Sequence, residues 1–144
     1  MLIKKILFII VLIFIGMAVY RFFRIDSTDP NAVLRHYLSH WESNNTTGMY
    51  PLISAHAKGE LKRTLQVNNA ADYYSFFVQR RSDLSGFEVT SQRFEDRNGR
   101  FWVTLKMLDY VGREYSENAT FFMVKEGKNW RVDGWQKGET YCLP

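Results

Sequence analysis

The hydrophobic pattern of the chain begins with one long apolar run and then changes to amphipathic spacing. No charged residue interrupts residues 6 to 20, which read ILFIIVLIFIGMAVY. An α-helix rises about 1.5 Å per residue and a bilayer core is roughly 30 Å thick, so about 20 residues are needed to cross it. Residues 2 to 23 reach this length if the basic residues among them extend to the interfaces. The run therefore predicts a single membrane-spanning helix.

A cleaved signal peptide is the alternative interpretation of the same run. Gly16 and Ala18 supply the small residues that a cleavage site needs. Bulky Tyr20, Phe22 and Phe23 follow them, which is typical of a membrane boundary rather than of a processing site. The order of residues favours an uncleaved signal-anchor.

Basic residues flank the run in equal number, so the positive-inside rule alone does not orient the helix. They are Lys4 and Lys5 before it and Arg21 and Arg24 after it. The short N-terminal tail favours an amino terminus in the cytoplasm and an exported domain. We predict a membrane anchor at 1–24, a linker at 25–30 and one extracytoplasmic domain at 31–144.

Helical spacing follows the linker. Apolar residues recur every three or four positions from 31 to 43, and Ser27, Thr28 or Asp29 can cap the helix that this spacing predicts. A second helix is expected from 49 to 65, and a strongly aromatic third one from 71 to 82.

From Gly86 the apolar period changes from helical spacing to two, which is typical of strands. Four strands are expected, at 87–96, 100–111, 114–125 and 129–137. Asn98-Gly99 is a strong hairpin signal, because both residues accept positive φ in a type I′ turn. Three helices followed by a four-stranded antiparallel meander predict an α+β domain with the helices on one face of the sheet.

Three sequence segments carry a resemblance to a known superfamily. They are Trp41-Glu42 at the end of the first helix, Met49-Tyr50-Pro51-Leu52-Ile53 at the start of the second, and Trp130-Arg131-Val132-Asp133-Gly134-Trp135 in the last strand. With the order of elements, they resemble the NTF2-like (SnoaL-type, cone-shaped) superfamily, and within it the membrane-tethered extracytoplasmic domains of bacteria. The resemblance implies a cone of helices on a curved sheet, and it implies little about function.

The charge pattern excludes one class of function. The chain carries a net charge of +4, from 19 basic and 15 acidic residues, but four of the basic residues flank the apolar run. The predicted domain is therefore neutral, whereas a nucleic-acid-binding domain shows a basic stripe. Cys142 is the only cysteine, so no intramolecular disulfide is possible.

A metal site is the first candidate for chemistry. His36 and His40 are four residues apart on the first helix, and His56 and Glu60 are four apart on the second. This spacing places two ligands on one helix face, as in helical zinc sites. Half-buried histidines are ordinary at the edge of an apolar face, however, and no cysteine accompanies them. We therefore predict no metal and no cofactor, and keep these four residues as weak candidates.

A cavity between helices and sheet is the second candidate. The enzymes of the resembled superfamily line such a cavity with Asp, His, Tyr or Arg, and this chain offers Tyr37, His40, Tyr73 and Asp133. Their spacing matches no enzymatic member, so no catalytic residue is assigned. The alternative interpretation places the tyrosines in the core.

An interaction surface is the third candidate, because large apolar residues occupy both predicted faces of the sheet. Trp102, Tyr110, Phe122 and Trp135 fall opposite the face that the helices are expected to cover. Exposed aromatic residues are common anchors of protein interfaces. A strongly curved sheet that buries them is the alternative.

These patterns favour a binding or assembly module over an enzyme. We expect a single-pass protein of the bacterial inner membrane, with its amino terminus inside, that contacts the membrane through residues 2–23. Its expected partner is another envelope protein or a second copy of itself. We expect no binding of nucleic acid. Two alternatives remain open: a cone-type small-ligand carrier or acid–base enzyme, and an immunity or inhibitor protein against an envelope toxin.

Overall fold

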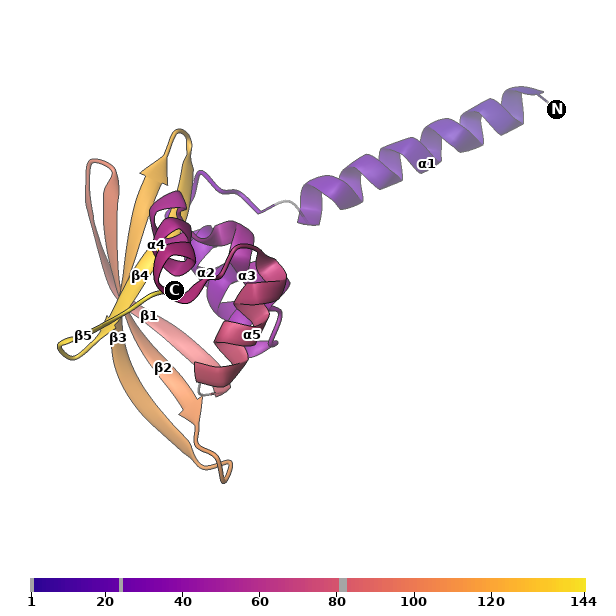
Figure 1. Ribbon diagram of the computed structural model, residues 1–144. Helices are drawn as coiled ribbons and strands as arrows, with labels where there is room; N and C mark the ends of the chain where they lie inside the picture. The colour runs from indigo at the N-terminus through magenta and orange to yellow at the C-terminus, as the bar shows by residue number, and fades with distance from the viewer. Residues whose placement is uncertain (1, 24, 81–82) are drawn as a thin grey trace.

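The computed structural model describes residues 2–23, 25–80 and 83–144, and the side chains of all of these except 2–5, 18–23 and 79–80. Helices lie on one side of a twisted antiparallel sheet, and a separate N-terminal helix projects away from both (Figure 1). The helices are α1 (Leu2–Phe23), α2 (Pro30–Glu42), α3 (Thr46–Met49), the 3₁₀ turn η1 (Tyr50–Leu52), α4 (Ala55–Leu65) and α5 (Ala70–Arg80). The strands are β1 (Asp83–Glu95), β2 (Asn98–Leu108), β3 (Glu114–Glu126), β4 (Asn129–Lys137) and β5 (Thr140–Cys142).

The apolar run forms α1, a continuous helix of 22 residues. Its large side chains from Ile6 to Met17 are 45% to 66% exposed, so the domain does not cover them. Within the described part of the chain, no helix combines the length and the apolar character needed to cross a membrane. The predicted interfacial residues Lys4, Lys5, Tyr20, Arg21, Phe22, Phe23 and Arg24 lie outside the described side chains.

Helix α2 begins as the sequence predicts. The Asp29 carboxylate accepts a hydrogen bond from the Asn31 backbone N–H at 2.9 Å, and Pro30 occupies the first turn. The helix buries one face against the sheet and α5. The buried residues are Val33, Leu34, Tyr37, Leu38 and Trp41.

The expected continuous helix from 49 to 65 is wrong. The chain forms α3 and η1, becomes extended at Ile53, and starts a new helix at Ala55. Ser54 caps α4 by accepting a hydrogen bond from the Ala57 N–H, and its own N–H donates to the Val132 carbonyl at 2.8 Å. A short parallel bridge between Ile53 and Val132 accompanies this bond. The break therefore depends on a partner about 80 residues away in sequence, which helical spacing does not contain.

The sheet is a meander in the order β1-β2-β3-β4-β5, so the expected four strands become five. The short strand β5 pairs with the end of β4, with Trp135 opposite Cys142. Strand β1 starts earlier than expected, because an irregularity between Leu84 and Gly86 lets the strand continue through the glycine. Strand β4 has the expected bounds.

Alternation along β2 and β3 agrees with the sequence pattern. The side chains that face the helices are buried: Phe101, Val103, Leu105 and Met107 from β2, and Ala119, Phe121 and Met123 from β3. Directly opposite pairs include Phe101 with Phe121 and Val103 with Ala119. These residues and the apolar faces of α2, α3, α4 and α5 form one core.

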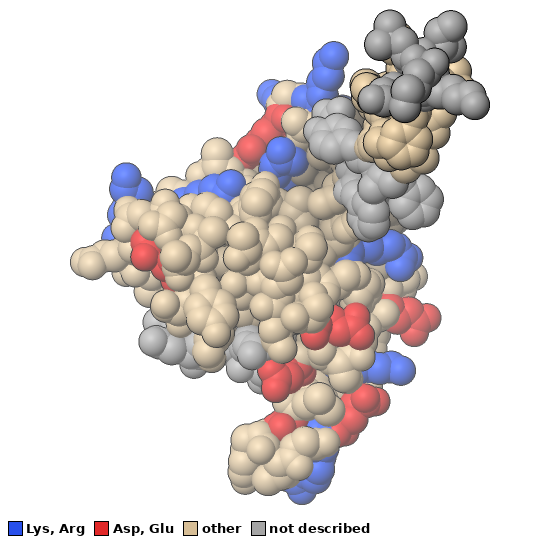
Figure 2. Space-filling model, turned by 90° about the vertical axis from the view of Figure 1, so that its right-hand side faces the viewer, with Lys and Arg blue, Asp and Glu red and all other residues tan. Residues whose placement is uncertain are grey.

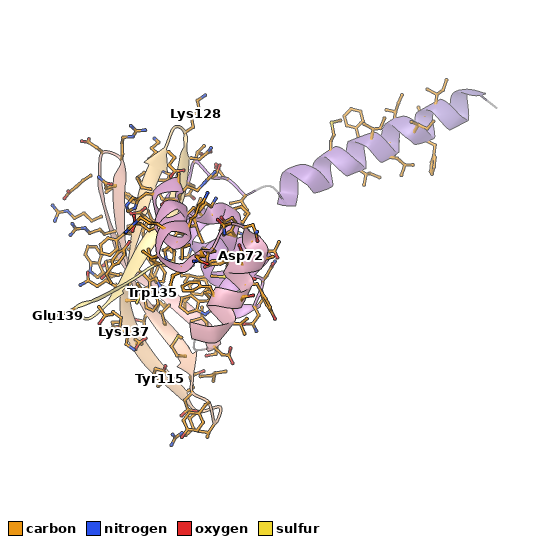
Figure 3. The ribbon with its side chains drawn as sticks, in the orientation of Figure 1. Asp72, Tyr115, Lys128, Trp135, Lys137 and Glu139 are labelled. Atoms are coloured by element: carbon orange, nitrogen blue, oxygen red, sulfur yellow. The ribbon has the colours of Figure 1, made fainter. Side chains whose placement is uncertain are left out.

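The expected position of Trp135 on the outer face is wrong. Met123 pairs with Val132 but Phe122 pairs with Gly134, so Asp133 is an extra residue in β4. Such a bulge shifts the alternation by one position. Trp135 consequently lies opposite Phe121 on the inner face, between the sheet and the helices (Figure 3).

Candidate interaction surface

Aromatic rings fill the space between helices and sheet, where a cone-type cavity was one of the predictions. Trp135 stacks on Phe121 with 5.9 Å between ring centroids and an interplanar angle of 14°. Trp41 meets Trp135 at 5.7 Å and Phe77 at 5.5 Å. Tyr37 contacts Phe121 edge-on at 6.4 Å. Aromatic packing of this kind stabilises a core.

Two of the predicted cavity residues, Tyr37 and Tyr73, belong to this packing. Both are fully buried, and their hydroxyl oxygens are 3.4 Å apart. Burial raises the pKa of Tyr37 and also that of Tyr73, so both phenols stay neutral and neither is suited to act as a base. Both tyrosines lie in the core, where the alternative interpretation of the sequence places them.

His40, the third predicted cavity residue, lies in the last turn of α2. Asn45 Nδ2 is 3.2 Å from His40 Nδ1, and the imidazole ring covers Gly48, where a Cβ atom would collide with it. Partial burial, and then the neighbouring His36, lower the pKa of His40. A neutral, packed imidazole is thus favoured.

Asp133, the fourth predicted cavity residue, forms a cluster with Ser54 and His56. The Ser54 hydroxyl donates to Asp133 Oδ1, and His56 Nδ1 lies 3.2 Å from the same oxygen. The residue types are those of a hydrolase triad, but the order is wrong: aspartate stands between serine and histidine. Ser54 is also fully buried and caps α4. The cluster joins α4 to the bulge of β4 and has no activated nucleophile.

The four weak metal candidates do not converge. The rings of His36 and His40 are 6.2 Å apart on α2, whereas His56 pairs with Asp133 and Glu60 pairs with Arg63 at 2.5 Å on α4. Among the described residues, no group of three or more His, Cys, Asp or Glu side chains is placed to hold a metal ion.

Two described hollows lie on the opposite, outer face of the sheet. The first has a volume of about 260 Å³. Phe122, Arg93 and Arg100 line it together with Tyr141, whose hydroxyl donates to the Asp133 carbonyl at 3.1 Å. The Tyr141 ring occupies the space that a Cβ atom on Gly134 would need, so β5 closes over the bulge at this glycine. Arg93 is paired with Glu95 at 2.7 Å.

The second hollow is a wider groove of about 610 Å³ around Trp102, which is 37% exposed. Its described lining comes from four neighbouring strands and the β4–β5 turn. The residues are Thr90, Ser91, Trp102, Val103, Thr104, Asn118, Ala119, Thr120, Gln136 and Gly138. Of the interface residues predicted from the sequence, Trp102 and Phe122 therefore line hollows on one face.

Tyr110 stands apart from both hollows, at the tip of the β2–β3 hairpin, and is 96% exposed. Asp109 bonds to the backbone of this loop. Its carboxylate accepts hydrogen bonds from the backbone N–H groups of Val111 and Arg113 and from Arg113 Nε, at 2.8 to 2.9 Å. These bonds lower the pKa of Asp109. The tip is a preformed loop rather than part of the outer-face groove.

The helix side presents a second exposed surface, which Figure 2 shows with few charged side chains at its centre. Tyr74 and Val78 of α5 are 53% and 44% exposed. Both described hollows lie on the outer sheet face.

Sequence reasoning missed Ser54 and Tyr141, which determine where Asp133 and Gly134 lie. Ser54 precedes a helix and so carried a capping signal, but its carboxylate partner is 79 residues away. Tyr141 lies in the tail after the last expected strand, and nothing in the local pattern marks it as the cover of Gly134.

No protein-family model matches the chain, and no curated protein does. Solved structures do. A SEC-C motif-containing protein from Rhodopseudomonas palustris is 13% identical, with 77% of this chain and 80% of that chain covered and a TM-score of 0.59. A sec-c motif-containing protein from Psychrobacter arcticus has 15% identity, coverage of 76% and 60%, and a TM-score of 0.48. An NTF2-like transpeptidase from Campylobacter jejuni has 14% identity, coverage of 72% and 96%, and a TM-score of 0.43. The first likeness shows a shared α+β fold.

Proposed function

We propose that the chain is a membrane-anchored binding module of the bacterial cell envelope, with an NTF2-like domain outside the cytoplasm and no catalytic activity. The anchor is α1, and its amino terminus lies on the cytoplasmic side of the inner membrane. The partner contacts the outer face of the sheet.

The uncovered apolar surface of α1 is the observation that carries the proposal. Side chains from Ile6 to Met17 remain 45% to 66% exposed, although a monomer in water rarely leaves a large contiguous apolar patch exposed. The described side chains alone span about 18 Å at 1.5 Å per residue. A complete crossing therefore needs the apolar residues on both sides of them.

The attachment of the linker supports the same proposal. The Ser27 hydroxyl donates to Asn129 Oδ1 at 2.5 Å, and the Trp130 N–H donates to the Ser27 carbonyl at 2.7 Å. Only residues 24–26 separate α1 from this docked position. The four steps from residue 23 to residue 27 span at most about 14 Å. A membrane that contained α1 would consequently lie close to the β3–β4 turn, where Lys128 is found (Figure 3).

A binding role accounts for the remaining geometry. The inner space is packed with aromatic rings, the Ser54–Asp133–His56 cluster joins secondary-structure elements, and both described hollows open on the outer face. A cone-type enzyme or carrier needs polar groups in a cavity between helices and sheet. Tyr37 and Tyr73, which would have supplied them, are instead fully buried.

Membrane fractionation tests the anchor. The full chain is expected in the membrane pellet after alkaline carbonate extraction, and external protease in spheroplasts should remove its domain. An I10K/I13K variant should move to the soluble fraction, because two central lysines are costly in a bilayer. V111K places a lysine on an exposed loop of the domain and should leave the pellet unchanged. Full carbonate extraction of the unaltered chain would contradict the proposal.

A further inference from the structure

The outer face of the sheet is organised in rows that cross the strands. Ser91 of β1 lies opposite Trp102 of β2, Trp102 lies opposite Thr120 of β3, and Thr120 lies opposite Gln136 of β4. Neighbouring strands are about 4.8 Å apart, so this row is about 14 Å long. The side chains of this row share the outer face, because the neighbouring residues Phe101, Val103 and Phe121 along the same strands point into the core. The row forms the floor of the wider groove.

Hydrogen-bonding groups surround the Trp102 ring in fixed positions. Asn118 Oδ1 accepts from the Thr104 hydroxyl at 3.1 Å, which leaves Nδ2 directed away from this bond as a donor. Gln136 Nε2 donates to the Gly138 carbonyl at 2.8 Å, which leaves its Oε1 as an acceptor. The Thr90 hydroxyl donates to the Trp102 carbonyl at 3.0 Å. The groove thus offers both donors and acceptors beside an aromatic ring.

Charge is absent from the described lining of this groove. Charged residues lie around it: Arg93 and Arg100 line the other hollow. Glu88 of β1 lies opposite Thr104, at the end of the row that holds Asn118, and Lys106 lies one row further along β2. Fifteen basic and fifteen acidic residues follow position 24, so an uncharged strip across four strands is a specific feature of this surface.

From this combination we infer that the groove binds a neutral saccharide chain of the cell envelope. One sugar ring stacks on the Trp102 indole, and its hydroxyl groups bond to Asn118 Nδ2, Thr120 and Gln136 Oε1. A sugar has an apolar ring face and a rim of hydroxyl groups that both donate and accept, and the groove has the complementary groups. Its length across four strands accommodates more than one ring.

Other occupants fit the groove less well. An apolar helix would bury Asn118 and Gln136 against apolar atoms, which is costly for polar groups without partners. A polyanion would find no cation in the described lining of the groove. The inference specifies the ligand class for the proposed binding role, and it does not depend on the membrane anchor.

Calorimetric titration of the full chain tests the inference. The chain is dissolved in lauryldimethylamine oxide, a detergent without a sugar headgroup, and titrated with a neutral hexamer of β-1,4-linked N-acetylglucosamine, cellohexaose or anionic polygalacturonate. A neutral oligosaccharide should bind, and W102A should weaken it at least about tenfold, as expected for removal of a central aromatic anchor. N118A should weaken it by a smaller factor. Y110A, which removes an exposed aromatic residue elsewhere, should leave it unchanged.

Several results would overturn the inference. These are binding of neither neutral sugar, equal binding by W102A and the unaltered chain, and binding only of polygalacturonate with loss in R100A. A chain that sediments as a dimer and becomes monomeric in W102A would show that a second copy occupies the groove. Urea denaturation followed by far-ultraviolet circular dichroism reports whether each variant folds, so W102A is judged only if it unfolds cooperatively, and N118A otherwise decides. The result is independent of carbonate extraction, which tests the anchor alone.

Discussion

The two faces of the sheet both carry aromatic residues, and the neighbours of those residues make the faces different. On the inner face, Phe101 and Phe121 are fully buried. Phe121 meets rings from α2 and β4, and Phe101 meets the ring of Phe94 from β1. On the outer face, Trp102 and Tyr141 are 37% and 51% exposed. Threonine, asparagine and glutamine surround Trp102. An aromatic residue in a strand therefore indicates packing or binding only when the residues beside it are known.

The largest expected effect follows from removing an inner ring. F121A deletes a ring that stacks on Trp135 and contacts Tyr37, and we expect it to lower the free energy of unfolding by about 3–5 kcal/mol. W102A, on the outer face, should lower it by about 1 kcal/mol. Urea denaturation of both variants measures the difference. Equal losses would show that Trp102 also belongs to the core.

Ser54 gives the next effect. S54A removes the cap of α4 and the hydroxyl that bonds to Asp133, and we expect a loss of about 2 kcal/mol. S91A removes a hydroxyl from the outer face and should change stability by less than about 0.5 kcal/mol. Urea denaturation again measures both. If S54A were as stable as S91A, the joint between α4 and β4 would not contribute to folding.

The buried phenol pair gives a smaller effect that depends on both partners. Y37F or Y73F leaves one buried hydroxyl without its 3.4 Å neighbour, which should cost about 1 kcal/mol in either case. The double variant should cost less than the sum of the two, because it leaves no unpaired hydroxyl. Additive losses in this double-mutant cycle would show that the two hydroxyls do not interact.

The smallest effect is a dependence on pH at His40. Burial, and then His36, lower its pKa in the folded chain below the ordinary value of 6.5. The unfolded chain therefore binds more protons between the two pKa values, and acidification through this window destabilises the fold. H40Q should lose less stability than the unaltered chain between pH 7 and pH 5. Parallel curves for the two proteins would contradict the assignment.

Local patterns were sufficient for much of the inner face. Strict alternation in β2 and β3 placed Phe101 and Phe121 correctly, and Asp29 capped α2 as predicted. The errors occur where distant residues decide local structure. The helix breaks at Ser54 because its partners are Val132 and Asp133, and Trp135 changes face because of the bulge at Asp133.

The outer face was predictable only in part. Trp102 and Phe122 could be placed there from alternation, but their separation into two hollows depends on strand register and on β5. Tyr141 covers Gly134 from a strand that the sequence pattern did not indicate. Which exposed aromatic residue lines a hollow is thus a property of the whole sheet.

Site-specific photo-crosslinking in intact cells tests the central claim most directly, because it compares the two exposed surfaces of the domain. A benzophenone amino acid replaces Ser91, which lines the groove opposite Trp102, in one full-length chain and Tyr74, which is 53% exposed on α5, in another. The account predicts a heavier adduct on irradiation from position 91 and none from position 74. Adducts from position 74 alone would contradict the account and assign binding to the helix side.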